Sequence, residues 1–146
     1  MRILGIDYGD RHLGLALSDP LGMFAQPLET YSLKDRKADN AAYFRKLVAA
    51  HDVGRIVIGL PLRMDGTPGT RSEKTREFAR WLEGVTKLPI VFWDERLTTQ
   101  QATAIMHEQN VREKDRKSVE NQIAAALILQ AYLNGQTEET PDPVRS

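Results

Sequence analysis

The apolar positions of the first nineteen residues fall into two short runs separated by a polar turn. Ile3–Asp7 is β-branched and apolar like a core strand, and Leu13–Asp19 is a second run of the same kind. The turn between them contains Gly9, which can adopt a positive φ without penalty, and the turn-forming segment Asp10-Arg11-His12. The pattern predicts a hairpin that holds the carboxylate of Asp7 near the end of a rigid, central strand.

The remaining apolar positions predict further strands and helices. Pro27 places a third strand, Gln26–Leu33, at a sheet edge, because proline cannot donate a ladder hydrogen bond. Trp81 and Trp93 belong to later apolar patterns and are expected in the core. The later elements are a helix over 38–51 that ends before Gly54, a strand over 55–61, a helix capped by Thr70 and Glu73, a strand over 89–93, a helix capped by Thr98 or Thr99, a polar connector over 109–117, and a helix from Ser118 to about Leu133 that Gly135 ends.

This order of elements predicts one α/β domain over residues 1–135, followed by a disordered polar tail over 136–146. We expect a five-stranded mixed sheet that starts with three antiparallel strands and is flanked by helices. Ligands of such sheets bind at the carboxyl ends of parallel strands, where Asp7 and Glu95 both fall. A desolvated carboxylate costs free energy unless it is paired, hydrogen-bonded or bound to a cation. Asp7 is therefore either an acceptor of backbone N–H bonds in the turn or a metal ligand.

Composition excludes several classes of site. Twenty basic residues balance twenty acidic ones, so no overall positive field indicates a nucleic-acid binder, although local patches remain compatible with neutrality. The chain has no cysteine and three scattered histidines, so any metal site must be rich in oxygen ligands. No apolar run approaches the roughly 20 residues of a membrane span, and no signal-peptide pattern precedes the first strand. We expect a cytoplasmic protein that does not contact membranes.

Six short motifs resemble, in their order, those of the YqgF/RuvX family. They are Gly5-Ile6-Asp7-Tyr8-Gly9, Ser18-Asp19, Gly59-Leu60-Pro61, Met64-Asp65-Gly66-Thr67, Asp94-Glu95-Arg96-Leu97-Thr98 and Ile128-Leu129-Gln130-Ala131-Tyr132-Leu133. Members of that family have an RNase H-like fold. They are described as Holliday junction resolvases or as nucleases that process the 5′ end of the precursor of small-subunit ribosomal RNA. The resemblance implies a nuclease whose partner is branched DNA or a ribosomal RNA precursor.

The resemblance also implies a catalytic site that binds two divalent metal ions, Mg²⁺ or Mn²⁺, through side-chain oxygens. Asp7 would bridge the metals, Glu95 would supply a second carboxylate, and the third acid of the family comes from the first turn of the last helix. The matching residue in this chain is Asn121. Its amide offers an oxygen but no negative charge, so the affinity for cations should fall even if the geometry survives. Glu120 is a poor substitute, because one residue along a helix turns the side chain by about 100°.

Four arginines are candidates for contact with phosphate oxygens, which guanidinium groups bind in a bidentate manner. Arg11 lies in the hairpin turn and Arg96 follows the second acid, and either could equally pair with a nearby carboxylate. Arg63 and Arg71 flank a glycine-rich loop that would overhang the carboxyl ends of the strands and could clamp a nucleic-acid backbone.

Three functions remain open at this point. The first is a metal-dependent endonuclease acting on structured RNA or branched DNA. The second is a phosphate-binding ATPase fragment, because the opening hairpin also resembles the phosphate element of actin and sugar-kinase folds, although those proteins clasp nucleotide between two such domains. The third is a non-catalytic nucleic-acid-binding or ribosome-associated module, which Asn121 favours. Symmetric cleavage of a junction would need paired sites and hence a homodimer, whereas an enzyme that trims RNA could work alone.

Overall fold

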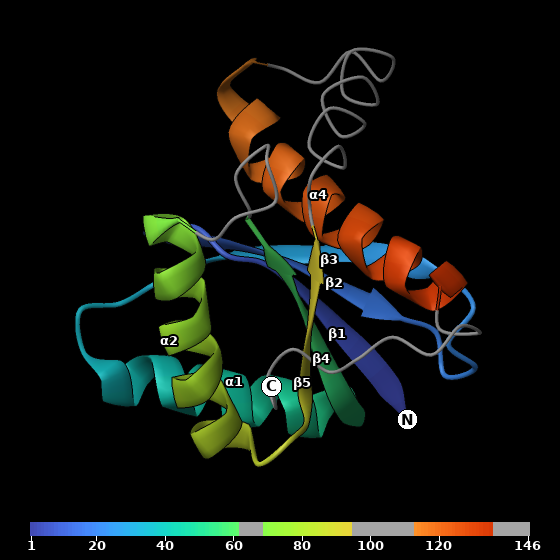
Figure 1. Ribbon diagram of the computed structural model, residues 1–146, viewed down its shortest axis with the longest axis horizontal. Helices are drawn as coiled ribbons and strands as arrows, with labels where there is room; N and C mark the ends of the chain where they lie inside the picture. Colours follow the sequence, from blue (N-terminus) through green and yellow to red (C-terminus); the bar gives the residue numbers. More distant parts are fainter. Residues whose placement is uncertain (62–68, 95–112, 136–146) are drawn as a thin grey trace.

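The chain folds around one five-stranded sheet whose strands follow the order β3-β2-β1-β4-β5. The structure is a computed structural model that describes residues 1–61, 69–94 and 113–135, the last segment with side chains from residue 119 onward. Helices α1 and α2 cover one face of the sheet, and α4 lies across the other (Figure 1). The elements are β1 (Arg2–Asp7), β2 (His12–Ser18), β3 (Ala25–Ser32), α1 (Lys37–Ala50), β4 (Val53–Leu60), α2 (Thr70–Thr86), β5 (Ile90–Asp94) and α4 (Glu113–Gly135).

The strand pairing confirms the expected mixed sheet. β1 pairs antiparallel with β2, and β2 pairs antiparallel with β3. On the other side, β1 pairs in parallel with β4, and β4 pairs in parallel with β5. β1 is therefore central and β3 lies at an edge, where a register shift next to Pro27 accommodates the missing N–H donor.

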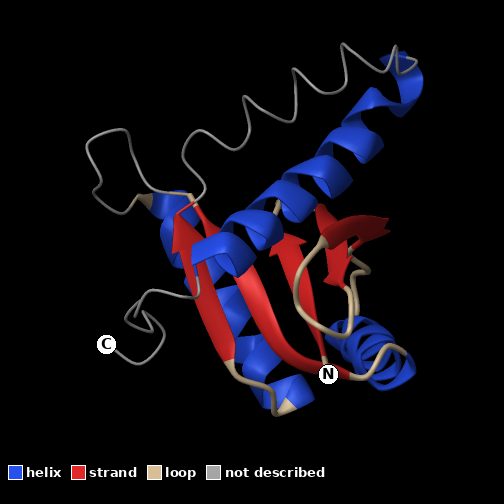
Figure 2. Ribbon diagram, turned by 90° about the vertical axis from the view of Figure 1, so that its right-hand side faces the viewer, coloured by secondary structure: helices blue, strands red, loops and turns tan. Residues whose placement is uncertain are grey.

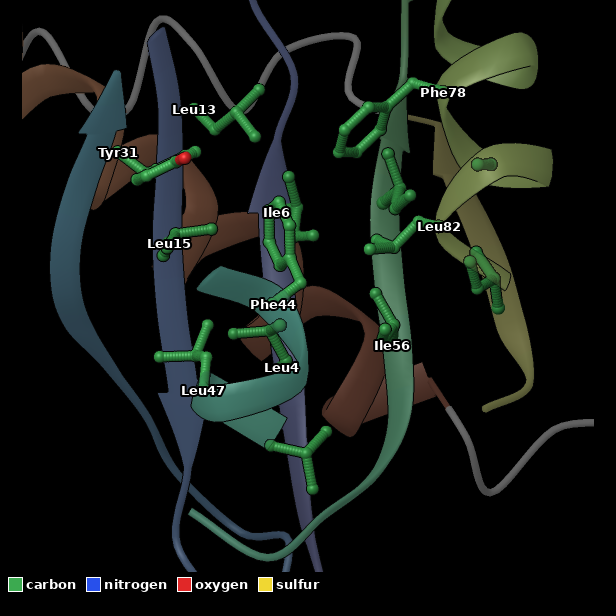
Figure 3. Packing of buried hydrophobic residues seen from close by; sticks show 14 of the residues in the cluster. Leu4, Ile6, Leu13, Leu15, Tyr31, Phe44, Leu47, Ile56, Phe78 and Leu82 are labelled. Atoms are coloured by element: carbon green, nitrogen blue, oxygen red, sulfur yellow. The ribbon is translucent and has the colours of Figure 1, made fainter. Parts of the chain in front are cut away.

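The two faces of the sheet are packed by different kinds of residue. Toward α1 and α2, the core consists of large aliphatic and aromatic side chains, including Phe44 and Phe78, which close over Ile6 of β1 (Figure 3). Toward α4, the buried side chains are fewer and include small ones such as Ala16 and Ala125. Figure 2 shows α4 running diagonally across the strands on this second face. In the described part of the chain, no helix is both long enough and apolar enough to cross a bilayer.

Two of the expected helix boundaries are wrong. The residue that caps α2 is Gly69 and no side-chain cap bond forms, so Thr70 and Glu73 do not make a capping box. Ser72 instead donates its hydroxyl hydrogen bond to the carbonyl of Pro61. The last helix begins at Glu113 rather than at Ser118, because the charged residues before Ser118 are good helix formers and continue the helix. Gly135 is the final residue of that helix, which confirms the expected end.

Two glycines of the expected turns have a role different from a left-handed backbone. Gly9 does not use the positive φ that is open to glycine. Glycine is needed there because a Cβ would lie 2.6 Å from the carbonyl oxygen of His12. The exit from α1 uses Asp52, whose φ is 51°, and Gly54 already belongs to β4. The expected helix capped by Thr98 or Thr99 and the tail over 136–146 lie outside the described residues.

Candidate metal-binding active site

Asp7 is the last residue of the central strand β1 and is half-buried. Side chains alternate along a strand, so Asp7 shares a face with Gly5, whereas Leu4 and Ile6 point into the core under α1 and α2. Gly5 lies against Ala125 and Leu129 of α4. Asp7 therefore stands on the α4 face of the sheet, at the carboxyl end of β1.

Gly14 brings the part of α4 around Asn121 to this end of the strand. In the β1–β2 ladder, Gly14 is the direct partner of Asp7. A Cβ added to Gly14 would lie 1.9 Å from the carbonyl oxygen of Asn121, so the backbone of α4 rests directly on β2 at this point. The backbone of Asn121 is thus placed beside the carboxyl end of β1, next to the strand position that pairs with Asp7.

A second glycine fixes the direction of the helix. A Cβ on Gly5 would come within 2.8 Å of Cβ of Leu129 and 3.1 Å of the carbonyl oxygen of Ala125. Contact at Gly14 and at Gly5 sets α4 close to the sheet at two points. The sequence motifs did not identify Gly14 as a functional position. The signal was nevertheless present, because a glycine inside a strand often marks a close approach of another backbone.

Hydrogen bonds hold α4 at both ends of the contact. Near its start, Gln122 Nε2 donates to Thr30 Oγ1 of β3 at 3.3 Å. Farther along, Gln130 accepts the N–H of Ala25 at 2.9 Å and donates to the carbonyl of Met23 at 3.0 Å. Arg55 of β4 donates to the hydroxyl of Tyr132 at 2.6 Å. These bonds run to three different strands or loops, so α4 is fixed against sliding and against rotation.

The donor set suits a hard divalent cation. Asp7 contributes a carboxylate and Asn121 an amide oxygen, and Mg²⁺ and Mn²⁺ both prefer oxygen ligands. Within residues 1–61, 69–94 and 119–135, no three His, Asp or Glu side chains gather as a metal-binding group. Glu95, together with Arg63 and Arg96, lies outside the described residues, and the roles expected for these three stay predictions.

Asp94 lies on the other side of the sheet from Asp7. It follows Phe92 by two residues in β5, and Phe92 is buried in the core under α1 and α2. Strand alternation then points Asp94 toward that same face. Its carboxylate is therefore not a ligand of the site on the α4 face.

Arg71 of α2 reaches the same strand end. Its Nη2 donates to the carbonyl oxygen of Tyr8 at 3.3 Å, which places an exposed guanidinium one residue beyond Asp7. Arg11 is exposed in the hairpin turn, where its carbonyl accepts the N–H of Leu33 at 2.7 Å. Burial and the charges of Asp10 and Glu77 raise the pKa of Tyr8, and Arg71 opposes this shift. The Tyr8 hydroxyl thus stays protonated at neutral pH and can donate a hydrogen bond.

Solved structures share this architecture at low sequence identity. The chain is similar to Thermus thermophilus RuvC in complex with a Holliday junction substrate, with a TM-score of 0.57 and 15% identity over 94% of this chain and 98% of that one. It is also similar to the yeast mitochondrial Holliday junction resolvase Ydc2, with a TM-score of 0.57 and 10% identity over 92% and 78% of the two chains. These similarities confirm the expected RNase H-like fold.

Closer relatives cover nearly the full length. The chain is 45% identical to a protein of Syntrophus aciditrophicus named "Putative pre-16S rRNA nuclease", over 95% of this chain and 92% of that protein. A protein of Koribacter versatilis with the same name is 41% identical over 99% and 94% of the two chains. The family model described as RuvX, Holliday junction resolvase, matches residues 1–135. The chain belongs to the RuvX family of nucleases.

Proposed function

We propose that this protein is a divalent-metal-dependent endonuclease that hydrolyses phosphodiester bonds in a precursor of 16S ribosomal RNA. The relatives that carry this name share 41% to 45% of their residues with the chain over almost its whole length. The two resolvase structures described above share 15% and 10%. Ribosomal RNA is therefore the better supported substrate, and a cytoplasmic location belongs to the same proposal.

The observation that carries the proposal is the contact between Gly14 and Asn121. It joins the backbone of α4 at Asn121 to the ladder partner of Asp7, at the end of the sheet where ligands of this class of fold bind. This contact between distant parts of the chain supports a site to which Asp7 and Asn121 each contribute an oxygen donor. Glu95 is the third member of the proposed set on the strength of its family motif alone.

Each described residue has a distinct part in the proposed reaction. Divalent ions at such a site activate a water molecule and neutralise the leaving oxygen of the phosphodiester. Asp7 supplies the negative charge that binds the cation, and Asn121 supplies a neutral oxygen. Arg71 stands at the strand end with donors that fit phosphate oxygens and would orient the substrate strand. Replacement of the family's acid by Asn121 predicts weaker metal binding and slower cleavage than in relatives with three acids.

Cleavage of Holliday junctions is the second candidate, because the matching family is described as a Holliday junction resolvase. Two symmetric cuts need two active sites, so this function requires a homodimer. Sedimentation of the protein with and without a four-way junction measures whether it forms this dimer, and cleavage assays with both nucleic acids identify the substrate. A monomer that cleaves the RNA precursor and leaves the junction intact supports the ribosomal function.

The test of the proposed site is the Asp7→Asn variant, which removes charge without changing volume. We expect cleavage of the RNA precursor with Mn²⁺ or Mg²⁺ to fall by about a thousandfold or more, which corresponds to about 4 kcal/mol of lost transition-state stabilisation. Thermal stability should be retained. Asp35→Asn, at an exposed loop position, is the matched control and should cleave like the parent protein.

Three other outcomes would contradict the proposal. Retained cleavage in Asp7→Asn would place the catalytic centre elsewhere. Hydrolysis of ATP, with no cleavage of either nucleic acid, would support a phosphate-binding ATPase. Binding of the RNA precursor without cleavage at any metal concentration would identify a non-catalytic module.

A further inference from the structure

A cavity of about 240 Å³ lies beside the carboxyl end of β1, on the face of the sheet that carries α1 and α2. Tyr8 lines it from the segment that follows β1, and Lys37 lines it from the start of α1. Leu33 and Asn40 contribute to the same side as Lys37, and α2 forms the other wall with Lys74, Glu77, Phe78 and Trp81. The metal-binding site does not use this cavity, because Asp7 points to the opposite face.

Aromatic rings form one wall of the cavity. The ring centroids of Tyr8 and Phe78 are 4.8 Å apart, and those of Phe78 and Trp81 are 5.8 Å apart. Phe78 is buried, whereas Tyr8 and Trp81 are half-buried and border both the core and the cavity. Unpaired nucleic-acid bases stack on such rings, because every base has a flat π face.

Charged groups line the same cavity. Lys37 and Lys74 are exposed and can contact phosphate oxygens. Lys74 Nζ lies 4.0 Å from Asp10 Oδ1, with 55% and 66% of the two side chains exposed, so this weak ion pair leaves the lysine available. Glu77 supplies acceptor oxygens for the exocyclic amine of a base. The fourth polar residue, Asn40, is already used by bonds to Tyr31 and Lys34.

The cavity and the metal-binding site are adjacent along the chain. Asp7 and Tyr8 are consecutive residues, and their side chains point to opposite faces at the same strand end. Arg71 binds the Tyr8 carbonyl and so lies at the edge between the two sites. A nucleic-acid strand crossing this edge can present a phosphate to one face and a neighbouring base to the other.

We propose that the cavity binds one unpaired base of the nucleic acid, stacked on Tyr8 and Trp81, with the flanking phosphates on Lys37 and Lys74. The inference rests on the proposed function, since the base belongs to the strand that is cleaved. The carboxylate of Glu77 selects bases with an exocyclic amine. Adenine is therefore bound in preference to uracil, which has no such amine.

The first experiment uses fluorescence from one tryptophan. The chain has two tryptophans, so Trp93→Phe leaves Trp81 as the single reporter. A single-stranded A10 RNA, titrated into this protein in EDTA, should quench the emission of Trp81. The double variant Lys37→Gln/Lys74→Gln should weaken binding by about tenfold, because two phosphate contacts are lost. Lys46→Gln, at an exposed position of α1 outside the cavity, should bind like the parent.

The second experiment tests base selection. Glu77→Ala should remove the preference for A10 over U10, because the acceptor for the amine is lost. Glu83→Ala, at another exposed position of α2, should keep it. Unchanged affinity in Lys37→Gln/Lys74→Gln, or no quenching of Trp81 by either RNA, would overturn the proposal.

Binding in EDTA separates this inference from the nuclease assignment. If Asp7→Asn abolishes cleavage while the lysine variants bind A10 normally, the base site is wrong and the nuclease assignment stands. If the lysine variants bind A10 weakly while the parent protein cleaves nothing, the base site stands and the nuclease assignment is wrong.

Discussion

The two faces of the sheet differ in the size of the side chains that pack the helices against them. Under α1 and α2, large side chains such as Phe44, Phe78 and Leu82 fill a deep core. Under α4, the strand positions Gly5 and Gly14 carry no side chain, so the helix approaches the strand backbone closely at these two points. The first arrangement gains free energy from buried apolar area, and the second fixes the position of a backbone. The face that carries the proposed metal-binding site is therefore the one on which the distance between helix and sheet is set most narrowly.

The comparison predicts that adding a single methyl group has opposite effects on the free energy of unfolding at Gly14, under α4, and at Gly84 of α2. Gly14→Ala forces a Cβ against the carbonyl of Asn121 and should lower the free energy of unfolding by about 3 kcal/mol. Cleavage should be lost as well, because α4 moves away from Asp7. Urea denaturation with an unchanged m-value measures the first effect.

Gly84→Ala is the matched control in α2. A Cβ there meets nothing within 4 Å, so alanine should raise the free energy of unfolding by about 0.5 to 1 kcal/mol through its better helix propensity. Equal stability of Gly14→Ala and the parent protein would show that α4 does not rest on β2.

Introducing a negative charge at position 121 gives a smaller and more selective test. Asn121→Asp should bind Mn²⁺ about tenfold more tightly by calorimetry, a gain of about 1.4 kcal/mol, and should cleave faster. Without metal, repulsion from Asp7 raises the pKa of one of the two carboxyl groups in the folded state. The stability of the metal-free variant should then decrease as the pH rises through that raised pKa.

Asn134→Asp makes the same chemical change at an exposed position near the end of α4. It should leave both the affinity for Mn²⁺ and the pH profile as they are in the parent. A gain in affinity of the same size in both variants would mean that Asn121 has no special position relative to the metal.

The smallest expected effect concerns the loop that joins β2 to β3 and contacts α4. Asp19 Oδ1 accepts the N–H groups of Met23 at 2.7 Å and Phe24 at 2.8 Å. The bond from Phe24, followed by that from Met23, lowers the pKa of Asp19. The loop should keep this stabilisation above the ordinary pKa of aspartate and lose it as the pH falls through the lowered value.

Amide NMR shifts of Met23 and Phe24, followed from about pH 5 to pH 2, report this transition directly. In Asp19→Asn the transition should disappear. Persistence of the same titration in that variant would assign it to another group.

Much of the fold follows from local pattern. The apolar run that ends at Asp7 predicted a central strand, and Pro27 predicted an edge. The predicted start of α4 at Ser118 was wrong, because the charged residues before it favour a helix and not a connector. The contact between Gly14 and Asn121 is a tertiary contact between distant segments, and the periodicity of neither segment contains it.

The contact between β2 and α4 also has a consequence for the order of events during synthesis. The hairpin that carries Asp7 leaves the ribosome early, whereas α4 follows the rest of the described chain. A nascent chain without α4 lacks the segment that would complete the proposed metal-binding site. If the proposal holds, the enzyme stays inactive while it is being made, and hydrolysis begins only after the carboxyl-terminal helix has docked.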